Sequence, residues 1–475
     1  MKTLQDITTY LKEYQNKEMC QFITCGSVDD GKSTLIGRLL YDSQTLFEDQ
    51  LHSLQKDSQK LGTQGDEIDF ALLVDGLASE REQGITIDVA YRFFSTEKKK
   101  YIIADTPGHE QYTRNMATGA SGADAAIILI DARKGVLTQT KRHSYIVSLL
   151  GIKKIIVAVN KMDLVGYSQE VFQNIQTAYR EIIPNLPNFG TISFDFLPLS
   201  ALKGDNILQN SSNMLWFKGL PLIELLDSLS FTHNTNENFR LPVQYVNRPN
   251  LNFRGFCGSI ASGSIKVGDE IVVLPSKNKS KVKAIITPDI KNLEDKEAIP
   301  TTKEASVPMA VTLCLEDEID ISRGDIIAKD SLPKLAKNLK VNLVWMDKTP
   351  LKPHTSYVIK RATSVIYGEF EKILFKKDIN TFEEIPADSL ELNDIAQCEL
   401  KLDRILAFDD YENNRLMGSF IVIDKYTNAT LGAGMIIEAL EEKITTQTRT
   451  YSPQEIALNS FIRTHYPEWE CKRVE

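Results

Sequence analysis

Short apolar runs alternate with segments of helical spacing from residue 21 to about residue 200. Because the runs are apolar on both faces, they predict parallel strands covered by helices on both sides of a sheet. Apolar residues that recur every three or four positions predict the intervening helices. The expected strands lie at residues 22–23, 101–104, 125–130, 154–159 and 194–199, and the expected helices at 34–40, 44–55, 69–81 and 139–150. This part is therefore an α/β domain with a mostly parallel, doubly wound sheet.

The pattern changes near Arg240, where short strand-like pieces separated by glycine and aspartate turns replace the alternation. Such regular short strands with few helices predict two antiparallel β-barrels. The expected strands lie at 256–260, 264–267, 270–274 and 281–286, and then at 341–345, 357–359, 399–402, 418–423 and 434–437. We therefore expect five parts along the chain: an N-terminal helix (1–20), the α/β domain (21–235), two barrels (236–333 and 334–443) and a helical tail (444–475).

Each end of the chain carries a helix signal. Leu4, Ile7, Leu11 and Tyr14 form an apolar stripe, which either packs on its own protein or docks on a partner. Residues 452–455 read Ser-Pro-Gln-Glu, a capping serine followed by proline and then glutamate at the third helical position. A helix is expected from there to about residue 464.

Composition narrows the class of protein. A chain of 475 residues needs more than one core, and 42% hydrophobic with 25% charged residues is typical of globular domains. The net charge of -9 argues against a dominant contact with nucleic acid. Six scattered cysteines, none in a C-x-x-C pair, indicate a reducing compartment. Without a secretory signal or a long apolar span, we expect a cytoplasmic protein.

A phosphate-binding loop follows the strand at 22–23. The segment matches G-x-x-x-x-G-K-[ST], in which backbone N–H groups wrap a phosphate, the lysine reaches β and γ oxygens, and the hydroxyl faces Mg²⁺. A glycine turn without a ligand is the alternative. The residues concerned are Gly26, Ser27, Val28, Asp29, Asp30, Gly31, Lys32, Ser33 and Thr34.

A D-x-x-G motif follows the strand at 101–104, as Asp105, Thr106, Pro107 and Gly108. Asp105 is expected to hold Mg²⁺ through water, and the Gly108 N–H to bond a γ-phosphate. His109 comes next, where it can orient the attacking water; a plain surface histidine is the alternative.

A base-reading motif follows the strand at 154–159, as Asn160, Lys161, Met162 and Asp163. The Asp163 carboxylate can accept from guanine N1–H and from the exocyclic amine, a donor pair that adenine lacks. Lys161 can lie along the ring and Asn160 can bridge loops. After the strand at 194–199 come Ser200, Ala201 and Leu202, with the Ala201 N–H available to guanine O6.

Thr86 is the candidate switch-one ligand of Mg²⁺ and γ-phosphate, with an ordinary strand residue as the alternative. The catalytic candidates are thus His109, Lys32 and Thr86, and the metal candidates are Ser33, Thr86 and Asp105. Four of the motifs end predicted strands, where open α/β sheets bind ligands. GTP with Mg²⁺ is the expected occupant.

Other conspicuous residues receive plainer interpretations. Residues 98–100 (Lys-Lys-Lys) are expected at a solvated hairpin tip, and Lys277, Lys279, Lys281 and Lys283 on an exposed strand face. Trp216, Trp345 and Trp469 are either packing residues or partner anchors.

Longer strings carry a resemblance to a family. The chain resembles translational GTPases and, more narrowly, the GTPase subunits of bacterial sulfate adenylyltransferase (ATP sulfurylase). The resemblance covers nearly the whole chain. It is carried by residues 26–43, 81–94, 104–121, 253–256, 316–325 and 427–430.

The resemblance implies a role in sulfate activation. In that family, GTP hydrolysis drives the uphill formation of adenosine 5′-phosphosulfate and pyrophosphate from ATP and sulfate. The adenylyl transfer occurs on a partner subunit of the ATP-pyrophosphatase type. From the charge and the apolar pattern given above, we expect neither a nucleic acid nor a membrane as a partner. Some relatives carry a fused C-terminal kinase, for which the 23 residues after Ser452 (475 minus 452) leave no room. A translation elongation or release factor is the alternative, and a nucleotide-binding protein without turnover is a third.

Overall fold

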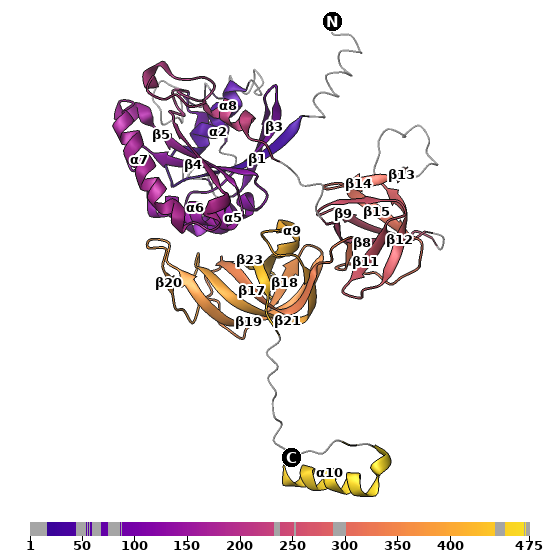
Figure 1. The fold of residues 1–475 in the computed structure, drawn as a ribbon. Coiled ribbons are helices and arrows are strands. Elements are labelled where there is room, and N and C mark those ends of the chain that lie inside the picture. The colour runs from indigo at the N-terminus through magenta and orange to yellow at the C-terminus, as the bar shows by residue number, and fades with distance from the viewer. Residues whose placement is uncertain are drawn as a thin grey trace. The chain divides into compact units, whose positions relative to one another are not determined.

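The structure is a computed structural model (Figure 1). It describes residues 17–43, 54, 56, 58, 68–74, 86, 88–231, 238–250, 253–287, 301–441, 452–469 and 471. The expected N-terminal stripe, nearly all of the expected helix at 44–55 and most of that at 69–81 lie outside these residues. The chain divides into two compact units, Met1–Ala439 and Leu440–Glu475.

A six-stranded sheet forms the centre of the α/β domain, with the strand order β2-β3-β1-β4-β5-β6. All neighbours pair in parallel except β2, which is the antiparallel edge strand. The mostly parallel sheet predicted from the apolar runs is confirmed. The strands are β1 (Glu18–Cys25), β2 (Ala90–Ser95), β3 (Lys99–Asp105), β4 (Ala125–Asp131), β5 (Lys154–Asn160) and β6 (Ser193–Pro198).

Helices cover both faces of this sheet (Figure 1). All seven residues of β4 are buried, with alternate side chains in two different cores. Ile128 and Ile130 pack with α5, α6 and α7, whereas Ile127 and Leu129 pack with α2 and α8. This two-sided burial explains the unbroken apolar run in the sequence. The helices are α2 (Lys32–Asp42), α5 (Thr113–Ser121), α6 (Thr138–Leu149), α7 (Gln169–Ile182) and α8 (Leu222–Ser228).

The described start of the helix expected at 69–81 is a short 3₁₀ turn, η1 (Phe70–Leu73). The Asp69 carboxylate accepts from the Ala71 N–H at 3.2 Å, which favours a tight capped turn at this point. Phe70 is buried, and a side chain at Gly37 of α2 would collide with its backbone carbonyl oxygen at 2.0 Å. The close approach to α2 therefore requires glycine there.

The first β-rich part has the strand order β7-β16-β11-β12-β15-β9-β8, and all its ladders are antiparallel. Its core contains Phe239, Phe256 and Ile271. The strands are β7 (Arg240–Pro242), β8 (Tyr245–Asn247), β9 (Gly255–Ser259), β10 (Ser264–Lys266), β11 (Glu270–Leu274), β12 (Lys279–Ile286), β13 (Thr301–Thr302), β14 (Glu304–Ser306), β15 (Ala310–Leu315) and β16 (Ile326–Ala328).

The second β-rich part closes on itself, because β18 pairs with both β22 and β19. Trp345 lies in its core and is 1% exposed, so this tryptophan is a packing residue. A short helix, α9 (Arg415–Gly418), precedes β22 where a strand was expected to begin. The strands are β17 (Lys334–Trp345), β18 (Ser356–Arg361), β19 (Ser364–Lys377), β20 (Glu384–Ile385), β21 (Ile395–Phe408), β22 (Ser419–Ile423) and β23 (Thr430–Ala439).

Two groups of lysines were predicted to be exposed to solvent, and the structure confirms one group fully. Lys277, Lys279, Lys281 and Lys283 are exposed, as expected. The interpretation of residues 98–100 as a solvated hairpin tip was wrong for Lys99, which is 5% exposed and begins β3. Its ammonium group donates to the Leu229 carbonyl and pairs with Glu18 at 3.3 Å. The pairing of β1 with β3 brings Glu18 to it, and Leu229 comes from the end of helix α8.

The second unit contains helix α10 (Pro453–His465). The Glu455 N–H donates to the Ser452 hydroxyl at 3.3 Å, and the Ser452 N–H donates to the Glu455 carboxylate at 2.9 Å. The predicted capping box is therefore confirmed. Of the helices in the described residues, none has both the length and the apolar character needed to cross a membrane.

Candidate functional site

Four predicted motifs start at the carboxyl ends of neighbouring strands. The P-loop follows β1, the D-x-x-G motif starts at the last residue of β3, the N-K-x-D motif at the last residue of β5, and Ser200 comes after β6. Since β3, β1, β4, β5 and β6 are adjacent and parallel, these segments lie at one edge of the sheet. Contacts between the loops show how closely they are joined.

The P-loop is shaped by residues with left-handed backbone angles, Asp29 (φ 68°) and Gly31 (φ 92°). A β-carbon at Gly31 would lie 2.4 Å from the Asn160 amide nitrogen, so the N-K-x-D motif packs directly on this glycine. The Lys32 ammonium group donates to the Gly26 carbonyl at 3.0 Å and to the Ser27 carbonyl at 2.9 Å. Burial lowers the pKa of Lys32, and Asp30 and Asp105 oppose this shift.

The D-x-x-G motif contacts the P-loop through its glycine. A β-carbon at Gly108 would lie 2.4 Å from the Lys32 ammonium nitrogen and 2.5 Å from the Gly26 carbonyl oxygen. Thr106 donates its hydroxyl to the Thr24 carbonyl of β1 at 2.7 Å, and Asp105 is 1% exposed. Any larger residue at position 108 would displace the lysine.

His109 begins a 3₁₀ turn, η2 (Glu110–Tyr112), and its Nδ1 accepts from the Gln111 N–H at 3.2 Å. The next residue is held from two sides. Asn393 donates its amide to the Glu110 carbonyl at 2.8 Å, and Arg142 of α6 pairs with the Glu110 carboxylate at 3.3 Å. The sequence analysis did not find Asn393, because no local pattern links a barrel turn to a loop 283 residues away.

The N-K-x-D asparagine bridges three segments. The Asn160 amide donates to the Asp30 carbonyl at 2.8 Å, and its oxygen accepts from the Lys161 N–H at 2.8 Å and the Ala201 N–H at 3.0 Å. The Ala201 N–H, expected to be available to guanine O6, is therefore engaged by Asn160 in this structure. Asn160 itself is 1% exposed.

The aspartate of the same motif lies beside the last loop, where the Ser200 hydroxyl donates to the Asp163 carboxylate at 2.6 Å. This contact orients one carboxylate oxygen. Met162 is fully buried and anchors the motif in the core. Leu202 contributes through its carbonyl, which accepts from Arg38 of α2 at 3.2 Å.

A further acid, missed from the sequence, supports the lysine of this motif. Asp131 ends β4, is 1% exposed, and pairs with Lys161 at 3.2 Å and with Arg133 at 2.6 Å. Burial alone would raise its pKa, but hydrogen bonds from Arg133 and the charge of Lys161 lower it to about 2. Its signal in the sequence was a charged residue directly after a wholly apolar strand.

Thr86 is partly exposed. Residues 75–85 and 87 lie outside the described part of the chain, so the position of Thr86 relative to the P-loop stays a prediction. Ser33, at the second position of α2, is also partly exposed.

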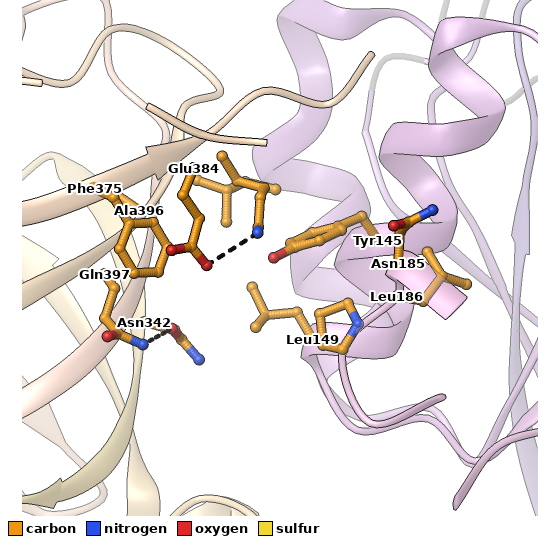
Figure 2. Close-up of a pocket in the computed structure, with 12 residues that line it drawn as sticks. Tyr145, Leu149, Asn185, Leu186, Asn342, Phe375, Glu384, Ala396 and Gln397 are labelled. Carbon is orange, nitrogen blue, oxygen red and sulfur yellow. Dashed lines mark hydrogen bonds and ion pairs between the residues drawn. The ribbon is translucent and has the colours of Figure 1, made fainter. Parts of the chain in front are cut away.

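A cavity of about 260 Å³ lies elsewhere, among Tyr145 and Leu149 of α6 and strands β17, β19 and β21 (Figure 2). Glu384 pairs there with Lys377 at 3.2 Å. None of the residues of the four motifs lines this cavity, so it is separate from the candidate nucleotide site.

The fold and these loops define a GTP-binding protein of the translation-factor class. Residues 17–233 match the family described as Elongation factor Tu GTP binding domain, and residues 338–437 match GTP-eEF1A C-terminal domain-like. Among solved structures, sup35 complexed with GDP covers 90% of this chain and 95% of that chain, with 22% identity and a TM-score of 0.40.

Three curated relatives share the name sulfate adenylyltransferase subunit 1. The protein from Sulfurovum sp. (strain NBC37-1) is 56% identical, with 100% of this chain and 99% of the relative covered. That from Aliarcobacter butzleri is 56% identical (100% and 98% covered), and that from Saccharophagus degradans is 54% identical (99% and 97% covered). The chain belongs to the family of sulfate adenylyltransferase subunit 1. It is an enzyme subunit with a GTPase domain, and the family name implies a partner subunit.

Proposed function

We propose that this chain couples GTP hydrolysis to the formation of adenosine 5′-phosphosulfate and pyrophosphate from ATP and sulfate. The adenylyl transfer takes place on a partner subunit of the ATP-pyrophosphatase type. The observation that supports this most is that the P-loop, D-x-x-G, N-K-x-D and Ser200 segments lie together at one edge of the sheet. The full-length relatives of the chain carry the name sulfate adenylyltransferase subunit 1. Those names do not favour a translation factor.

Phosphate binding falls to the P-loop, residues 26–34. The Lys32 ammonium group now donates to two carbonyls of its own loop, and a triphosphate would exchange these for charge-assisted bonds to β and γ oxygens. The N–H groups of the loop and of Gly108 would surround the phosphates. Because a side chain at Gly108 would collide with Lys32, glycine keeps that space open.

Guanine selection falls to Asp163, with Lys161 along the ring. One carboxylate oxygen of Asp163 is oriented by Ser200, and both can accept from guanine N1–H and its amine. The Asp131 carboxylate neutralises Lys161 from behind and holds it. Adenine has no such donors, so it would leave the Asp163 oxygens without hydrogen-bond partners, and adenine nucleotides should therefore bind much more weakly.

Hydrolysis requires a positioned water, and His109 is the residue that we assign to it. Its Nδ1 accepts a backbone N–H in the structure, which leaves Nε2 as the protonated nitrogen of the neutral ring. Thr86 and Lys32 complete the group that would act on the γ-phosphate.

The residues present suit Mg²⁺, because Ser33, Thr86 and Asp105 offer hydroxyl and carboxylate oxygens, the hard donors that this ion takes alongside phosphate oxygens. Asp105 is buried at the end of β3, the strand next to that which leads into the P-loop. When bound, the ion would neutralise charge on the β and γ phosphates. We also propose a cytoplasmic location, since all six cysteines are free.

The test combines the purified chain with its partner subunit and measures conversion of ATP and sulfate with and without GTP. GTP should stimulate the reaction, and Asp163→Asn should abolish that stimulation. Xanthosine triphosphate should restore it in the variant, because xanthine carries a carbonyl where guanine carries the amine and the asparagine amide can donate to it. Asp410→Asn, which removes a carboxylate from the second β-rich part, should leave the stimulation by GTP unchanged. Stimulation by GTP that survives Asp163→Asn would refute the assignment.

A further inference from the structure

The P-loop contains a buried carboxylate, that of Asp30, which is 1% exposed. Its Oδ2 accepts from the Ser27 N–H at 2.6 Å, whereas Oδ1 has no hydrogen-bond partner in the described part of the chain. A buried acceptor without a donor is costly, and more so when it carries charge. The loop therefore retains a negative group that it compensates only in part, although the loop itself serves to bind an anion.

The backbone on both sides of this carboxylate is held in place. The Asp30 carbonyl accepts from the Asn160 amide at 2.8 Å, and the Asp30 N–H donates to the Ser27 carbonyl at 3.3 Å. A β-carbon at Gly26 would lie 3.2 Å from Oδ2, so the start of the loop packs on the carboxylate. These contacts keep the charge inside the loop.

Three charged neighbours from two segments of the chain influence Asp30. Lys32 in the same loop and Lys134 after β4 favour its ionised form, whereas Asp131 at the end of β4 disfavours it. Lys32 directs its hydrogen bonds to loop carbonyls. Burial is the largest influence and raises the pKa of Asp30 to about 6. The carboxyl therefore gains or loses its charge close to neutral pH.

We propose that the Asp30 carboxylate sets the affinity of the P-loop for guanine nucleotides, because its negative charge opposes the phosphates and hastens their release. The inference rests on nucleotide binding at this loop, as proposed above. Binding and protonation are then linked: a nucleotide favours protonated Asp30, and protonation favours the nucleotide by the same factor. A nearby like charge shifts a carboxyl pKa by about one unit or more, which corresponds to about tenfold in affinity.

The direction with pH follows from the sign of that shift. Nucleotide raises the pKa of Asp30 above its value of about 6 in the free protein. Affinity is therefore highest below that pH and falls as pH rises through it. With a shift of about one unit, the fall ends near pH 7. Rapid release at neutral pH would let the subunit begin a new cycle without a separate exchange protein.

The decisive variant is Asp30→Asn, which keeps an oxygen for the Ser27 N–H and removes the charge. Binding and dissociation of a fluorescent GDP analogue are measured on the full chain from about pH 5.5 to about pH 8.5. At the upper end the variant should bind about tenfold more tightly and release the analogue more slowly. The phosphate of the analogue also titrates near pH 6, but equally for both proteins, so the difference between their pH profiles reports Asp30.

Two further variants separate charge from structure. Asp30→Ala removes the acceptor as well, and should bind less tightly than Asp30→Asn; equal affinity of the two would overturn the role of the Ser27 contact. Asp195→Asn removes one negative charge from β6 and should leave the pH profile unchanged.

Equal or weaker binding by Asp30→Asn at high pH, or identical pH profiles, would overturn the inference while leaving the proposed function intact. The wild-type profile checks the same point without any variant, since an affinity that rose with pH would contradict it. Absence of guanine nucleotide binding by the wild-type chain would instead defeat the proposed function itself.

Discussion

Replacement of Asn160 by alanine is the sharpest test of how the loops are joined. Its side chain makes three hydrogen bonds of 2.8–3.0 Å to three segments and is 1% exposed. Alanine would leave the Asp30 carbonyl and the N–H groups of Lys161 and Ala201 without these partners. At about 1 kcal/mol for each lost bond, the free energy of unfolding should fall by about 3 kcal/mol.

That loss is measurable as a change in melting temperature. For a domain of about 200 residues, 1 kcal/mol lowers the melting temperature by about 2–4 °C, so the transition of the GTPase part should fall by about 6–12 °C. Calorimetry of the full chain provides this value. Titration with a fluorescent GDP analogue should show an affinity at least about tenfold lower, because the ligand must now order the loops itself.

Asn414→Ala is the matched control. The Asn414 amide also makes hydrogen bonds through both its nitrogen and its oxygen: it donates to the Ser262 hydroxyl at 3.1 Å and accepts from the Met417 N–H at 3.1 Å. It lies in the second β-rich part, however, where it caps α9. At the same value per lost bond, this variant should lower the free energy of unfolding by about 2 kcal/mol, and it should leave nucleotide affinity unchanged. If Asn160→Ala melted like the wild type and bound GDP as tightly, the bridging role would be refuted.

Three other outcomes are expected. His109→Ala should spare GTP binding and slow single-turnover hydrolysis by about 10²-fold or more, since only water positioning is lost; equal damage to binding and hydrolysis would contradict that role. Thr86→Ala should uncouple GTP hydrolysis from the partner's reaction. Full GTP stimulation of phosphosulfate formation by this variant would show that the segment containing Thr86, switch one, does not carry the coupling. Arg240→Ala should lower the free energy of unfolding by about 3 kcal/mol, measured by thermal unfolding, because the buried guanidinium pairs with Asp409 at 2.9 Å. If the losses of Arg240→Ala and Asp409→Ala were additive in a double-mutant cycle, the pair would contribute nothing.

Much of the fold was readable from local pattern. The five parallel strands of the α/β sheet were visible as apolar runs, most clearly β4 and β5, because burial on both faces leaves few polar positions. The tail helix could be placed at Ser452 because a capping box involves residues only three apart. Edge strand β2 was not predicted, since it is antiparallel and alternates exposed with partly buried positions. Short barrel strands such as β13 and β16 lack enough residues to show any period.

The sequence by itself determined which residues follow the strands, and therefore the chemistry available at the sheet edge, since a motif is a property of adjacent residues. Only the tertiary structure decided how those residues are used: it engages the Ala201 N–H with Asn160, places Asn393 on Glu110, and turns the Asp30 carboxylate inward. Each of these depends on the folded path of the backbone or on groups far apart along the chain. Hydrophobic period and motif spacing carry no information about such contacts, because the free energy of a contact depends on what the fold brings within reach.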